Sequence, residues 1–98
     1  MTTYFVTRHP GAMLWAQQQG LAVDRQLDHL DMADIKPGDT VIGSLPVNLA
    51  AEVCAKQARY IHLILELPFA WRGKELSVDD MLRFGAKLQQ YHVNKVNA

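Results

Sequence analysis

The most constraining feature of this sequence is a set of three apolar segments that lack the polar alternation of a half-exposed strand. They read TYFVT (residues 3–7), TVIGSL (residues 40–45) and RYIHLILEL (residues 59–67). Such runs, rich in β-branched and aromatic residues, are typical of strands buried on both faces, as in a parallel sheet. Helical patterns lie between them. This alternation predicts an α/β domain with a mostly parallel sheet of about four strands, flanked by helices.

Punctuating residues place two helices between these strands. Pro10 and Gly11 end the first strand, and Gly20 closes the short helix AMLWAQQQ that follows. The second helix, PVNLAAEVCAKQA, takes Pro46 in its first turn. Its apolar stripe, at helical spacing, is predicted to consist of Leu49, Val53 and either Ala50 or Cys54.

One more helix is predicted in the C-terminal part of the chain. Ser77 is placed as its N-cap, and the carboxylates of Asp79 and Asp80 interact favourably with the positive end of the helix dipole. The helix is predicted to continue through MLRFGAKLQQYH, after which the chain frays. A short strand is expected near residues 25–30 and a turn in MADIKPGD. The predicted order is therefore β-α-β-β-α-β-α.

Length and charge limit the class of protein. A chain of 98 residues predicts one domain, spanning residues 1–98. Its zero formal net charge argues against coating a long nucleic-acid duplex but allows a local site for a compact anion. The single cysteine, Cys54, fits a reducing cytoplasm and a buried hydrophobic role. The N-terminus lacks a signal-peptide pattern and no apolar run reaches membrane-spanning length, so we expect a cytoplasmic protein without a membrane partner.

The segment TRHPGA follows the first strand directly, and parallel sheets bind ligands beyond the carboxyl ends of their strands. Arg8 offers a planar fork of donors for phosphate oxygens, and His9 either donates to a phosphate or takes a hydroxyl proton. Gly11 allows close backbone approach, and the helix start adds unpaired N–H groups. Together these features predict an anion site for a phosphodiester. In the alternative interpretation Arg8 pairs with a nearby acid and His9 caps a backbone carbonyl.

A second loop, GSLPVN, follows the strand at residues 40–45. Ser44 and Asn48 are able to hydrogen-bond a phosphate, a ribose or a base edge, and Gly43 allows close approach. Alternatively, Ser44 caps the helix and Asn48 is solvated. If the strands that precede TRHPGA and GSLPVN are neighbours, both loops face one crevice.

Other polar residues favour structural roles. The acidic stretch DRQLDHLDMADIKPGD matches no metal-loop spacing, and a solvated face is the stronger interpretation. His62 is expected to be a satisfied core histidine. In the irregular connection PFAWRGKELS, Arg72 is placed as part of a lid, and Phe69 and Trp71 either stack on bases or, as we favour, form a dimer contact. No sequence motif supports a metal ion or a redox cofactor.

Two resemblances to known families bear on function. TRHPG resembles the opening of the histidine phosphatase superfamily, with Pro10 where that family has glycine, but the chain is too short for that fold. YFVTRHPGAMLWAQQQG, PGDTVIGSLPVNLAAEVCAKQARYIHL and LPFAWRGKELS resemble the small CRISPR-associated family Csx-sixteen, accessory proteins of type III systems, over nearly the whole chain. This resemblance implies a Rossmann-like (CARF-like) domain that acts as a homodimer without a metal. It also implies an antiviral ring nuclease that degrades cyclic tetra-adenylate.

The resulting hypothesis is a metal-independent phosphodiesterase. The 2′-hydroxyl of the cyclic oligoadenylate attacks phosphorus and yields linear di-adenylate with a 2′,3′-cyclic phosphate. Arg8 and His9 are the expected catalytic residues. The expected ligand-binding residues are Thr7, Gly11, Gly43, Ser44, Leu45, Asn48 and Arg72. The alternatives are a sponge that binds the cyclic nucleotide without cutting it, a phosphate-binding protein of histidine-phosphatase-like chemistry, and a purely structural protein.

Overall fold

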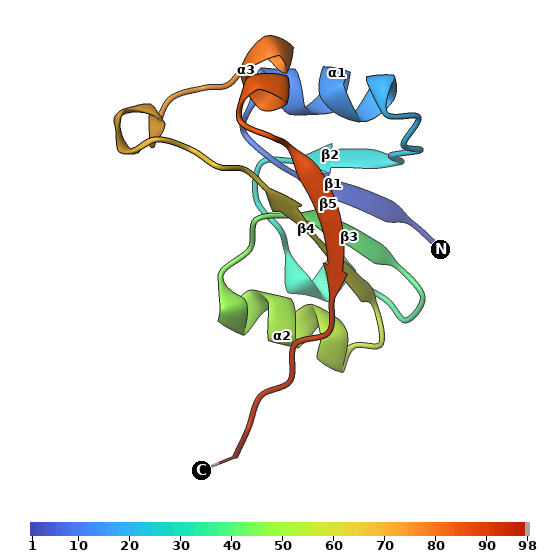
Figure 1. Ribbon diagram of the computed structural model, residues 1–98. Helices are drawn as coiled ribbons and strands as arrows, with labels where there is room; N and C mark the ends of the chain where they lie inside the picture. The colour runs from blue at the N-terminus through green and yellow to red at the C-terminus, as the bar shows by residue number, and fades with distance from the viewer. Residues whose placement is uncertain (98) are drawn as a thin grey trace.

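The computed structural model describes residues 1–97, and its centre is a five-stranded sheet. The strands are β1 (Thr3–Val6), β2 (Arg25–Leu27), β3 (Thr40–Gly43), β4 (Arg59–Ile64) and β5 (Lys87–Tyr91). They lie in the order β2-β1-β3-β4-β5 (Figure 1). The first four strands in the chain are parallel, and β5 runs antiparallel to β4. The predicted α/β class with a mostly parallel sheet is confirmed, and its topology is that of a Rossmann-like fold.

Helices cover both faces of this sheet. The structure has α1 (Pro10–Gln18), α2 (Val47–Ala55) and α3 (Val78–Arg83), with short 3-10 turns η1 (Met32–Asp34) and η2 (Phe69–Trp71). Figure 1 shows α1 and α3 together on one face and α2 on the other. The loop that contains η2 projects from the edge of the sheet. Within residues 1–97, none of the helices combines the length and apolar character needed to cross a bilayer.

The lack of polar alternation in the strands now has a simple cause. Successive residues of a strand point to opposite faces, and here both faces carry a core. Phe5 packs with Trp15 of α1 and Met81 of α3, whereas its neighbour Tyr4 packs on the other side with Val53 of α2. A strand of a sheet with helices on both sides therefore needs apolar residues at every position.

Pairing between β1 and β3 determines where the candidate loops lie. Val6 is in register with Gly43, so both strands end at the same level of the sheet. The chain passes from β1 to β2 on one side and reaches β3 on the other, which makes the β1–β3 junction the topological switch point. The strands that precede TRHPGA and GSLPVN are therefore neighbours, which is the condition under which the sequence places both loops at one crevice.

The prediction of a long C-terminal helix is wrong. Ser77 does cap α3 through a capping box with Asp80, as its sequence indicates, but the helix ends at Arg83. Gly85 has φ +70°, a left-handed conformation that stops the helix. The following KLQQY then pairs as β5 with the open edge of β4. Lys, Leu and Gln all favour helix intrinsically, so here tertiary pairing overrides local propensity.

Smaller differences concern element ends. Pro46 is the N-cap residue of α2 and stands one position before the first turn. The buried stripe of α2 consists of Ala50, Val53 and Cys54, while Leu49 is half-buried. The strand predicted near residues 25–30 stops at Leu27.

Gly11, at the start of α1, has the closest packing of the glycines in this chain. Its N–H donates to the carbonyl of Leu76 at 3.0 Å. A Cβ at position 11 would lie 2.2 Å from the carbonyl carbon of Ser77 and 2.6 Å from the Leu76 oxygen. Glycine therefore lets α1 contact the segment that leads into α3, and these backbone atoms cannot move aside as a flexible side chain would.

We expect Gly11→Ala to lower the free energy of unfolding by about 3 kcal/mol or more, because the added methyl group overlaps backbone atoms. Gly20→Ala is the matched control. Gly20 has φ +75°, and a Cβ at this position would have no neighbouring atom within 4 Å, so its cost of about 1–2 kcal/mol is conformational. Urea unfolding measures both values. Equal losses of stability in the two variants would contradict the packing role of Gly11.

Candidate anion-binding site at the carboxyl edge of the sheet

A cavity of about 700 Å³ opens beyond the carboxyl ends of β1, β3 and β4. Apolar residues at the end of β4 form part of its wall, and the projecting loop supplies another part. The polar and charged residues that line it are Thr7, Arg8, His9, Asp28, Ser44, His62, Lys74 and Glu75. Its volume falls in the range of small-ligand sites, about 300–1,000 Å³. Two cations and two carboxylates share the lining, so the cavity suits a ligand that carries both anionic groups and hydrogen-bond donors.

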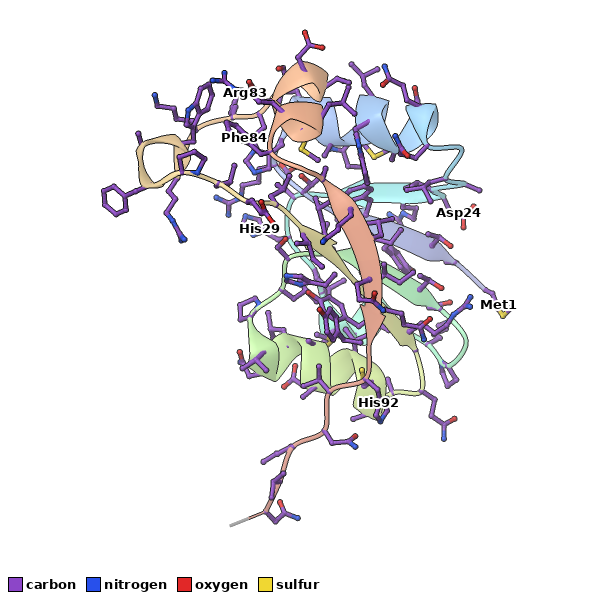
Figure 2. All side chains as sticks on the ribbon, viewed as in Figure 1. Met1, Asp24, His29, Arg83, Phe84 and His92 are labelled. Atoms are coloured by element: carbon purple, nitrogen blue, oxygen red, sulfur yellow. The ribbon has the colours of Figure 1, made fainter. Side chains whose placement is uncertain are left out.

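Arg8 is exposed, and its guanidinium contacts an imidazole. Its Nη2 lies 3.0 Å from Nε2 and 3.3 Å from Nδ1 of His29, a residue of the loop after β2. Figure 2 shows His29 at the side of the sheet from which the projecting loop leaves, with Asp24 and Met1 at the opposite side. The alternative in which Arg8 pairs with an acid is therefore not what the structure shows. Arg8 lines the cavity, and a guanidinium has further N–H donors of the kind that bind phosphate oxygens.

His9 makes two hydrogen bonds, one through its backbone N–H and one through its ring. Its own N–H donates to Oγ1 of Thr7 at 3.1 Å, and its ring Nδ1 accepts from the N–H of Leu76 at 3.3 Å. An imidazole that accepts at Nδ1 carries its proton on Nε2 in the neutral form. His9 thus presents a donor, whereas attack or proton abstraction through Nε2 requires the opposite tautomer. The alternative in which His9 caps a carbonyl is wrong, because its partner is an amide N–H.

The start of α1 does not offer the free donors that the sequence predicts. Pro10 has no N–H, that of Gly11 donates to Leu76, and that of Ala12 donates to the His9 carbonyl at 3.1 Å. Gly11 accordingly serves the approach of another backbone segment and not the approach of a ligand. At the start of α1, anion binding therefore depends on side chains.

Ser44 stands at the end of β3, and its hydroxyl donates to the carbonyl of Leu63 at 2.8 Å. The N-cap residue of α2 is Pro46, without a side-chain cap, so the capping alternative for Ser44 is also wrong. Since the proton of the hydroxyl is engaged, its oxygen remains as an acceptor toward the cavity. Ser44 is thus able to accept a hydrogen bond from a ribose hydroxyl or an adenine amine.

Tyr60 and His62, two positions apart on β4, form a hydrogen-bonded pair, and His62 lines the cavity. The Tyr60 hydroxyl accepts from the N–H of Leu45 at 3.0 Å, donates to the carbonyl of Gly43 at 3.1 Å, and lies 2.6 Å from Nδ1 of His62. Burial raises the pKa of Tyr60, so the phenol keeps its proton. His62 is satisfied at Nδ1, as expected, but it is only half-buried and lines the cavity. The expectation of a core position for His62 is therefore wrong, because its side chain is in part accessible from the cavity.

Besides Gly11, four predicted ligand-binding residues do not line the cavity. Gly43 is buried, and a Cβ there would lie 2.8 Å from the carbonyl oxygen of Val6, so its role is close packing of β1 and β3. The backbone of Leu45 is engaged by Tyr60. Asn48 lines a separate groove between α2 and residues 93–95, and Arg72 is an exposed residue of the projecting loop that does not line the cavity.

Sequence reasoning missed three charged residues of the lining. Asp28 immediately follows β2, so the strand-end rule that found Arg8 applies to it as well. Lys74 and Glu75 lie in the connection whose sequence suggests a lid or a dimer contact, and only the fold brings them to the cavity. Within residues 1–97, no three side chains of His, Cys, Asp or Glu gather in an arrangement suited to a metal ion.

Residues 4–94 match the family described as "Putative CRISPR-associated protein (Cas_VVA1548)". Searches of curated proteins and of solved structures found no match. The family match spans both loops of the cavity, the projecting loop and all five strands of the sheet except the first residue of β1. The chain therefore belongs to this CRISPR-associated family.

Proposed function

We propose that this protein is a metal-independent ring nuclease that opens cyclic tetra-adenylate, the second messenger of type III CRISPR systems. One observation carries the proposal. The switch point of the sheet gathers Arg8, His9 and Ser44 from two strand ends, and Lys74 from a distant loop, around one cavity. CRISPR association and the resemblance to Csx-sixteen supply the identity of the ligand.

The chemistry of the lining matches a nucleotide. Arg8 and Lys74 are suited to phosphoryl oxygens, and the Nε2–H of His9 adds a neutral donor. The carboxylates of Asp28 and Glu75 accept hydrogen bonds from ribose hydroxyls or from the adenine amine. A ligand with only negative charges would meet repulsion from these carboxylates, whereas an adenylate presents both kinds of group.

Cavity size bears on the oligomeric state. A volume of about 700 Å³ suits one or two nucleotides better than a ring of four. A two-fold homodimer presents the same cavity twice, so one ring is able to bridge two copies of the site. The proposed active unit is therefore a homodimer with a single ring across its interface.

Cleavage then uses the nucleophile that RNA itself contains. The ligand's 2′-hydroxyl attacks the adjacent phosphorus in line with the departing 5′-oxygen, and a 2′,3′-cyclic phosphate forms. Arg8 and Lys74 stabilise the charge that develops on the phosphoryl oxygens. Histidine-phosphatase-like chemistry is disfavoured, because a nucleophilic Nε2 on His9 needs its proton on Nδ1, where the Leu76 N–H already donates.

Radiolabelled cyclic tetra-adenylate, incubated in substrate excess with the purified protein and EDTA, is expected to yield linear di-adenylate over multiple turnovers. EDTA removes adventitious divalent metal, and substrate excess separates catalysis from stoichiometric binding. Chromatography resolves ring from linear product. Recovery of an intact ring after denaturation of a complex would identify a sponge instead. Recovery of an intact ring with no complex would contradict any role toward this messenger.

Arg8→Ala is expected to lower the single-turnover cleavage rate by about 100-fold or more, because it removes a charged donor from the transition state. Arg59→Ala is the matched control, since Arg59 is an exposed arginine at the start of β4, at the opposite edge of the sheet. Both rates are measured at saturating protein. An Arg8→Ala rate equal to that of Arg59→Ala would refute the assignment of Arg8.

A further inference from the structure

The strongest unassigned feature of the molecule is His62, whose ring nitrogens have different surroundings. Nδ1 faces the buried hydroxyl of Tyr60 at 2.6 Å, and the residue lines the cavity. The ring packs edge-on between Tyr60 and Tyr91, with centroid distances of 5.8 and 6.0 Å, so these contacts restrict its orientation. A histidine held in this way, beside a candidate phosphate site, is a candidate for proton transfer.

The Tyr60 network determines the tautomer of His62. A neutral phenol has one proton to donate and two lone pairs that accept. The Gly43 carbonyl is only an acceptor, so it takes the phenol proton, and the Leu45 N–H is only a donor, so it takes one lone pair. What remains for His62 is a lone pair on the Tyr60 oxygen. All three contacts are satisfied together only if Nδ1 of His62 carries a proton and donates it.

This assignment leaves Nε2 of neutral His62 unprotonated and therefore able to accept a proton. His9 has the opposite arrangement, because its Nδ1 accepts from Leu76 and its Nε2 carries the proton. Two histidines of one cavity are thus held in complementary forms, one as an acceptor and one as a donor. We propose that His62 is the general base of the cleavage reaction and that Tyr60 is the positioning residue that holds it ready. This inference rests on the proposed ring nuclease function.

In the proposed step, proton transfers accompany the formation of one bond to phosphorus and the breaking of another. Nε2 of His62 takes the proton of the ligand's 2′-hydroxyl while that oxygen forms a bond to the adjacent phosphorus. The bond between phosphorus and the 5′-oxygen breaks, and its electron pair leaves with that oxygen, which takes a proton from solvent water. His62 then returns its proton to solvent. The Nε2–H of His9 remains in place and donates to a phosphoryl oxygen throughout.

His62→Gln tests the base directly in the 98-residue chain. We expect single-turnover cleavage to fall by about 100-fold or more, while binding of the 2′-deoxy form of cyclic tetra-adenylate changes by less than about threefold. The control is His92→Gln, an exposed histidine that Figure 2 shows at the far end of β5, with unchanged rate and binding expected. Added imidazole is expected to restore part of the rate of His62→Ala. Cleavage by His62→Gln at the wild-type rate would overturn the inference and leave the nuclease function standing.

Two further measurements test the role of His62 without changing His62 itself. In the wild-type protein, nitrogen-15 shifts of the imidazole are expected to show a protonated Nδ1 on His62 and a protonated Nε2 on His9. In Tyr60→Phe, which removes the acceptor for Nδ1, the His62 tautomers are expected to mix and the rate to fall by about tenfold with ligand binding retained. An unprotonated Nδ1 on wild-type His62 would overturn the inference whatever the activity. A wild-type protein that does not cleave the ring would instead refute the proposed function and, with it, this role of His62.

Discussion

Pairing of β1 with β3 is the constraint on which the candidate site depends. The two strands end in register at Val6 and Gly43, and the chain diverges from this point toward opposite sides of the sheet. Gly43 makes the close approach possible, because a Cβ there would meet the Val6 carbonyl oxygen at 2.8 Å. Arg8 and Ser44, which follow these strands, therefore lie at one cavity. A slip of one residue in this register would turn the side chains of the shifted strand to the opposite face of the sheet.

Two hydrogen bonds then define the roles that we propose for the histidines of the site. The backbone amide of Leu76 donates to Nδ1 of His9 and leaves His9 as a donor, and in the proposed arrangement the phenol of Tyr60 holds His62 as an acceptor. Neither contact needs a metal ion or a second charged group. The segment that leads into α3 supplies the Leu76 amide, while Gly11 lets that segment lie against α1. Fold and chemistry are thus coupled, since the same packing that buries Leu76 also fixes the His9 ring.

Local patterns in the sequence were enough to predict part of this arrangement. Three buried strands and the N-cap of α3 depend on nearby residues alone, and Arg8 and Ser44 follow from the rule that ligands bind at strand ends. β5 was not predicted because the residues of KLQQY favour a helix. This segment forms a strand because it pairs with the open edge of β4. The prediction of free N–H donors at the start of α1 is wrong for a similar reason, since a distant segment of the chain engages one of them. The N–H of Gly11 donates to the carbonyl of Leu76, and Leu76 lies 67 residues from His9 along the chain. Lys74 and His62 line the cavity through the fold as well, His62 through the pairing of β4 with β3.

The most direct test of this account is a titration of the nitrogen-15-labelled protein with the 2′-deoxy form of cyclic tetra-adenylate, which lacks the attacking hydroxyl. The account predicts saturation at one ring for two chains. It also predicts chemical-shift changes concentrated at Thr7, Arg8, Ser44, His62 and Lys74, around the cavity at the carboxyl edge of the sheet. Changes confined to the opposite edge, near Met1 and Asp39, or no saturable change at all, would contradict the central claim that this cavity binds a cyclic oligoadenylate.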